Sequence, residues 1–89
     1  MYNKKYVLEK IEEFGVHNPI YEDIEGRTCF LAYLNPGERG WFLYIEDYGW
    51  REHAHRIHTS FIQDVEYTDD LVIVTTQNTK ITFRLVKPN

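Results

Sequence analysis

A cluster of histidines in the second half of the chain has the spacing of a metal site. The segment reads Glu52-His53-Ala54-His55-Arg56-Ile57-His58. On a strand, the two side chains of a His-x-His pair point the same way, with Cβ atoms about 7 Å apart, so His53 and His55 could share a metal ion. His58 falls on the opposite face of a regular strand and joins them only through a bulge. Further ligands would have to come from Cys29, Glu52 or His17. A solvated strand face has the same pattern and is the interpretation we favour, so we predict no metal site and no cofactor.

Hydroxyl and thiol groups near these histidines do not form a catalytic pattern. His58 and Thr59 are adjacent, and adjacent strand residues face opposite ways, so they cannot act as a nucleophile and its base. Ser60 lies outside any G-x-S-x-G motif. Cys29 lies in an apolar run, where burial raises a thiol pKa and makes the group inert. We therefore predict a protein that is not an enzyme.

Aromatic and arginine side chains crowd the middle of the chain. The aromatic residues are Tyr33, Trp41, Tyr44, Tyr48 and Trp50, and the arginines are Arg27, Arg39, Arg51 and Arg56. Such groups suit base stacking, phosphate pairing or a protein-binding hot spot, although about half of the rings would serve as core. Two large rings beside Gly49 in a turn are difficult to bury together, which favours a binding surface within residues 39–58. We predict that this surface consists of Arg39, Trp41, Tyr48, Trp50, Arg51 and Arg56, with Trp50 as the aromatic anchor and Arg51 and Arg56 as the charge-assisted contacts.

Composition limits the class of protein and the partners. The 89 residues are 43% hydrophobic and 27% charged, which is typical of one globular domain spanning residues 1–89. The 14 acidic residues outnumber the 10 basic ones, which argues against duplex nucleic acid as a ligand, and the acidic residues are too scattered for DNA mimicry. A single cysteine excludes an internal disulfide framework. With neither a signal peptide nor a membrane-spanning apolar run in the sequence, we expect a cytoplasmic protein that does not bind membranes.

The hydrophobic periodicity predicts one helix followed by strands. Val7, Ile11 and Phe14, widened by Leu8, form a helical stripe over Asn3 to Phe14, with Asn3 as the N-cap. The expected strands are Ile20 to Ile24, Thr28 to Leu34, Trp41 to Ile45, Trp50 to Tyr67, Leu71 to Thr76 and Lys80 to Val86. The segment Trp50 to Tyr67 also offers a helical stripe, but its β-branched and polar residues favour a bent strand.

These elements predict an α+β fold, in which the N-terminal helix packs on a roughly five-stranded antiparallel sheet or a small, partly closed barrel. Edge strands in so small a domain invite pairing with a second copy, so we expect a homodimer.

A stretch of about 30 residues resembles small uncharacterised phage and prophage proteins. In these a His-Thr-Ser strand, here His58-Thr59-Ser60, precedes a hairpin with a Thr-x-Asn-Thr turn, here residues 76–79. The chain departs from the pattern at Ile81, where an aromatic residue is expected. The resemblance implies a mobile-element origin and a role such as blocking a host defence factor, and it carries no catalytic residues across.

Together, these observations predict a small non-catalytic binding protein, phage-encoded, that inhibits a host protein through residues 39–58. One alternative is a module that sequesters a nucleotide or cyclic nucleotide through ring stacking and arginine–phosphate pairs. A second is a metal-binding protein that uses His53 and His55.

Overall fold

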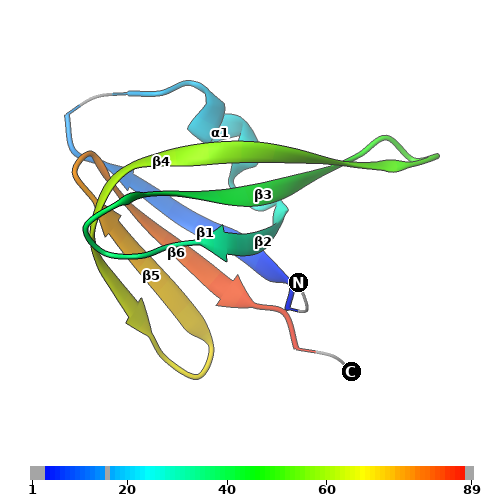
Figure 1. Cartoon of the computed structure of the whole chain (residues 1–89). Coiled ribbons are helices and arrows are strands. Elements are labelled where there is room, and N and C mark those ends of the chain that lie inside the picture. Colours follow the sequence, from blue (N-terminus) through cyan, green and yellow to red (C-terminus); the bar gives the residue numbers. More distant parts are fainter. Residues whose placement is uncertain (1–3, 16, 88–89) are drawn as a thin grey trace.

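The chain folds as a closed six-stranded antiparallel barrel in a computed structural model that describes residues 4–15 and 17–87 (Figure 1). The strands are β1 (Tyr6–Glu13), β2 (Thr28–Tyr33), β3 (Arg39–Asp47), β4 (Glu52–Tyr67), β5 (Leu71–Thr76) and β6 (Thr79–Leu85), and the short helix α1 (Ile20–Ile24) connects β1 to β2. Each strand pairs with its neighbours in sequence, and β6 pairs with β1. Strands make up 63% of the described residues and helix 6%.

The prediction of an α+β fold with an N-terminal helix is therefore wrong. Residues 6–13 form β1, and Asn3, the proposed N-cap, lies outside the described residues. The pairing of β1 with β6 shifts between Leu8 and Lys10, which marks a β-bulge. Because a bulge adds one residue between inward-facing positions, the core contacts of Tyr6, Leu8 and Ile11 are spaced by two and then three residues. Leu8 and Ile11 of the predicted stripe thus lie three residues apart as on a helix face, whereas Phe14 is 52% exposed and lies outside β1.

Residues Ile20–Ile24 form α1, where a short edge strand was expected. Pro19 stands at the N-cap position in a helical conformation, and the Asn18 side chain accepts a hydrogen bond from the Ile20 N–H at 3.2 Å. Glu22 and Asp23 follow in the first turn, where carboxylates suit the positive end of a helix. Ile24 then enters the core with no exposed surface, so α1 is held by packing and local caps.

The later strands lie where periodicity of two predicted them. Within the segment 50–67, where a bent strand was favoured over a helix, residues Glu52–Tyr67 form the 16-residue strand β4. Its first half pairs with β3 and its second half with β5, so it turns a corner and belongs to both sides of the barrel. Backbone hydrogen bonds hold that corner, because Ile62 accepts from the Gly37 N–H and donates to the Glu38 carbonyl, both at 2.9 Å.

The interior of the barrel is apolar. Phe42 and Phe83 meet edge to face at its centre, with ring centroids 5.1 Å apart. The other buried apolar side chains are Leu8, Ile24, Cys29, Leu34, Ile62, Val72, Val74 and Ile81. Burial raises the pKa of the Cys29 thiol to about 12. No helix in the described part of the chain is long and apolar enough to cross a membrane.

Candidate functional site: the β3–β4 hairpin

The β3–β4 hairpin extends beyond the barrel and places side chains on two opposite faces (Figure 1). Cross-strand partners share a face of a sheet, and alternate residues change face. We call the face that carries the buried Phe42 the inner face and the face that carries Trp41 the outer face. The hairpin ends in a two-residue loop, Gly49-Trp50, closed by the Tyr48 N–H donating to the Arg51 carbonyl at 3.0 Å.

On the outer face, Trp41 lies between neighbours from two strands. It pairs with Tyr33 of β2 and with His58 of β4. The guanidinium of Arg56 lies over the Trp41 ring, 4.3 Å from its centroid. Such stacking holds the guanidinium in place while its N–H groups remain able to bind a carboxylate or phosphate.

Arg39 extends this outer-face cluster toward the bend of β4. It pairs with Phe61, whose side chain is 49% exposed. Phe61 was not among the predicted binding residues, because alternation from Ile57 and Thr59 places it on the inner face. An irregularity in the β3–β4 pairing between Arg39 and Trp41 changes that alternation and leaves Phe61 outside the barrel.

Trp50 and Arg51 form a second cluster at the tip of the hairpin. Trp50 is 77% exposed, and the Arg51 guanidinium lies 4.8 Å from its ring centroid. Gly49 has a φ of +89°, which suits the first position of a two-residue hairpin loop and fixes Trp50 at its end. Asp47, where β3 ends, is six positions along the strand from Trp41, so the tip cluster lies about 20 Å from Trp41 in the outer-face cluster.

Tyr48, the sixth predicted residue, is directed toward a different group of side chains. Its hydroxyl donates to Glu46 Oε1 at 2.5 Å, and the same oxygen lies 2.9 Å from His55 Nε2. The His55 ring stacks on Tyr44 with centroids 5.1 Å apart. The Tyr48 hydrogen bond, followed by that of His55, lowers the pKa of the Glu46 carboxyl, and the Tyr48 pKa is raised in return.

The predicted binding residues therefore divide into two clusters and one side chain on the inner face. Arg39, Trp41 and Arg56 share the outer face, Trp50 and Arg51 share the tip, and Tyr48 joins the Glu46–His55 pair. Sequence proximity suggested one surface, but the extended hairpin spreads these residues along its length.

The candidate metal ligands His53 and His55 do lie together on the inner face, with ring centroids 4.7 Å apart. Glu46 is the cross-strand partner of His53 and contacts His55. Glu52 lies on the outer face and Cys29 in the core, so neither joins them. Within residues 4–15 and 17–87, no three histidine, cysteine or acidic side chains are arranged to hold a metal ion.

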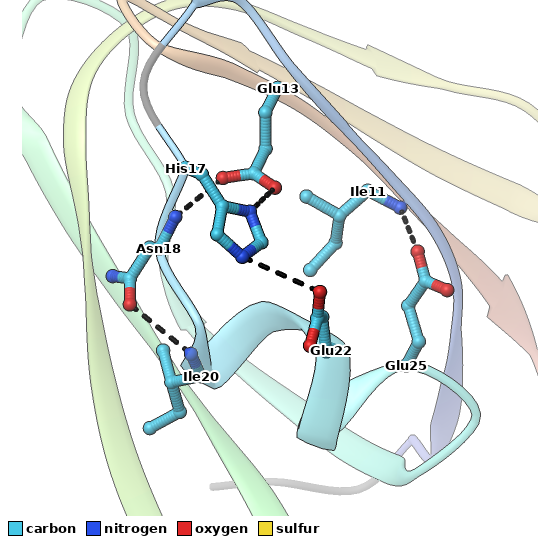
Figure 2. Close-up of polar contacts among 7 residues, drawn as sticks. All are labelled: Ile11, Glu13, His17, Asn18, Ile20, Glu22 and Glu25. Atoms are coloured by element: carbon cyan, nitrogen blue, oxygen red, sulfur yellow. Dashed lines mark hydrogen bonds and ion pairs between the residues drawn. The ribbon is translucent and has the colours of Figure 1, made fainter.

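His17, the other candidate ligand, belongs to the α1 connection (Figure 2). Its Nδ1 lies 2.9 Å from Glu13 Oε1 and its Nε2 lies 3.4 Å from Glu22 Oε1. Glu13 also accepts the Asn18 N–H at 2.7 Å. Because two separate carboxylates occupy the two ring nitrogens, this arrangement fixes the entry to α1 and leaves His17 away from the hairpin.

The residues that carry the resemblance to phage proteins form a polar network at the bend of β4. The Ser60 hydroxyl donates to Thr76 Oγ1 at 2.8 Å, and the same oxygen accepts the Thr79 N–H at 2.9 Å. Thr76 and Thr79 are both buried. The motif thus has a structural role here, since it joins β4 to the β5–β6 turn.

Comparison of the chain with protein-family models, with curated proteins and with solved structures finds no match.

Proposed function

We propose that the protein is a non-catalytic binding protein that engages a protein partner through the β3–β4 hairpin. The single observation that carries the proposal is Trp50, which is 77% exposed in a two-residue loop with Arg51 beside it. A large aromatic side chain costs little conformational entropy when a pocket on a partner buries it, and Trp and Arg are the residue types that most often dominate such contacts.

The chemistry of the hairpin indicates the kind of partner surface. Arg51 and Arg56 are both exposed and both lie over an indole ring. A guanidinium that is held on a ring presents its N–H groups to carboxylates in a fixed orientation. The complementary surface is an apolar pocket for Trp50 with an acidic side chain beside it for Arg51, and a separate acidic group for Arg56 on the outer face. The resemblance to phage and prophage proteins suggests that this partner is a host protein.

The test compares capture of partner proteins from the native host by the wild-type chain and two variants. We expect Trp50→Ala combined with Arg51→Ala to reduce capture by about tenfold or more, since hot-spot residues cost 2 kcal/mol or more when truncated. Tyr67→Ala is the control, because Tyr67 is another large aromatic side chain, 68% exposed, on the second half of β4. Equal capture by the wild-type chain and the Trp50 variant, with both folded, would overturn the proposal.

A spectroscopic measurement tests the same contact directly. Trp41 and Trp50 are the two tryptophans of the chain, so Trp41→Phe leaves Trp50 as the single tryptophan, which excitation at long wavelength selects over the tyrosines. A partner that buries Trp50 shifts its emission to shorter wavelength. Stabilisation of the chain by a nucleotide in a thermal-shift screen, with no such partner, would favour the nucleotide alternative instead.

A further inference from the structure

The first half of β4 has one open edge. Residues 52–61 pair with β3, and pairing with β5 begins only at Ile62. Within the described ranges, no backbone hydrogen bond joins the other side of residues 52–58 to a further strand. A row of unpaired N–H and C=O groups on an exposed strand is a template for another strand.

The turn of the hairpin determines which residues face this edge. Tyr48 and Arg51 form a hydrogen-bonded pair, and hydrogen-bonded and non-hydrogen-bonded pairs alternate along an antiparallel ladder. The backbone N–H and C=O groups of His53, His55 and Ile57 therefore point toward β3. On β3, the same alternation directs the Gly40 N–H toward β4, where it donates to Thr59 Oγ1. The residues whose backbone groups face the open edge are Glu52, Ala54, Arg56 and His58.

We propose that a second copy of this chain adds its own β4 to this edge, antiparallel and centred on Ala54. In that register, Glu52 of each copy lies opposite Arg56 of the other, which creates two ion pairs on the outer face. Ala54, the smallest side chain of the segment, meets its own counterpart at the two-fold axis. All of these are edge-facing residues, so the register satisfies the open N–H and C=O groups as hydrogen-bonded pairs.

The charges favour a second copy over an unrelated peptide, because the segment is complementary to itself. Centring the pair on Arg56 instead would bring two guanidinium groups together, and centring it on His55 would leave Glu52 opposite His58. The Ala54 register alone matches both charged residues of the segment with opposite charges. Because the hairpin extends beyond the barrel (Figure 1), two hairpins can form a four-stranded sheet with the barrels at its two ends.

Charge reversal tests the interface and its register together. We expect the wild-type chain to form dimers in sedimentation equilibrium. Glu52→Arg or Arg56→Glu alone should weaken self-association by about tenfold by creating like-charge pairs, and the double variant Glu52→Arg/Arg56→Glu should restore it. Glu66→Arg, the same change on the second half of β4, is the control and should have no effect. A wild-type monomer at every concentration, or failure of the double variant to restore association, would overturn the proposal.

A disulfide test gives an independent measurement. Cys29 is buried, so Ala54→Cys introduces the one exposed thiol of the chain. Hydrogen-bonded cross-strand partners have Cα atoms about 5.5 Å apart, within the range of a disulfide. Oxidation should convert Ala54→Cys to a covalent dimer much faster than Tyr67→Cys, an exposed position away from the edge. Equal rates for the two would contradict the pairing. Arg56 also belongs to the proposed partner surface, but both tests measure self-association in the absence of any partner and leave Trp50 and Arg51 intact. Failure here is therefore distinguishable from failure of the proposed function.

Discussion

At the scale of single residues, Gly40 shows how closely the barrel is packed where β3 begins. A Cβ atom added there would stand 2.2 Å from the Tyr33 carbonyl oxygen and 2.7 Å from Ile62 Cδ1. The first neighbour is backbone and cannot move without disturbing the β2–β3 pairing. Glycine is therefore required here by space, whereas Gly37 has a φ of +90° and open surroundings.

We expect Gly40→Ala to lower the free energy of unfolding by about 3 kcal/mol, through overpacking of the β2–β3 pair. Gly37→Ala should cost only about 1 kcal/mol, the penalty of a left-handed conformation without a clash. Urea denaturation of both variants measures the difference. Equal losses would show that the backbone near Tyr33 adjusts to the extra methyl group.

At the scale of elements, the α1 connection depends on a charged pair that sets its pH response (Figure 2). The Asn18 N–H, followed by His17, lowers the pKa of Glu13 from 4.5, and Glu13 raises the pKa of His17 from 6.5. The Glu13 contribution to stability is present above pH 4.5 and is lost as the pH falls through its lowered pKa. The His17 contribution is complete below pH 6.5 and is lost as the pH rises through its raised pKa. Both act together between pH 4.5 and 6.5.

Glu13→Gln should therefore bring the His17 pKa down toward 6.5 in an NMR titration of the ring protons. Glu22→Gln should lower it less, because Glu22 contributes the weakest of the effects that raise it. The thermal midpoint of the wild-type chain should also fall by more between pH 6 and pH 8 than that of His17→Ala. A His17 titration unchanged by Glu13→Gln would show that the pair does not form in solution.

At the scale of the whole molecule, closure of the barrel depends on two corners. At one, β1 and β2 meet through the register pairs Tyr6–Cys29 and Val7–Thr28, and the Leu8 N–H extends the contact to the Arg27 carbonyl at 3.0 Å. At the other corner, β4 bends where its pairing partner changes from β3 to β5, next to the loops that connect β2 to β3 and β5 to β6. Thr76 occupies this second corner, where its buried hydroxyl joins Ser60 and Thr79.

Thr76→Val removes that hydroxyl and leaves the buried Thr79 N–H without its acceptor. We expect a loss of about 2 kcal/mol in the free energy of unfolding, the cost of an unsatisfied buried polar group. Thr75→Val changes the adjacent, less buried residue of β5 and should cost much less. Similar losses for the two variants in urea denaturation would contradict a special role for the corner.

The sequence predicted the strands of the second half because each has one buried face and a short turn, so local alternation reflects the packing. It failed at β1 and α1. The bulge in β1 placed the core residues Leu8 and Ile11 three residues apart, as on a helix face, and α1 is too short to show any periodicity. For the site, the residue types of the hairpin were predictable, but their separation into an outer-face cluster and a tip cluster was not.

Composition and spacing alone thus determined a small antiparallel domain and an aromatic, arginine-rich hairpin. These properties depend on neighbours in the chain. Only the tertiary structure decided that the sheet closes into a barrel, that Phe61 lies outside it, and that the first half of β4 keeps an open edge. Each of these depends on register and on bends, which are set by contacts between residues far apart in sequence and leave no local periodicity behind.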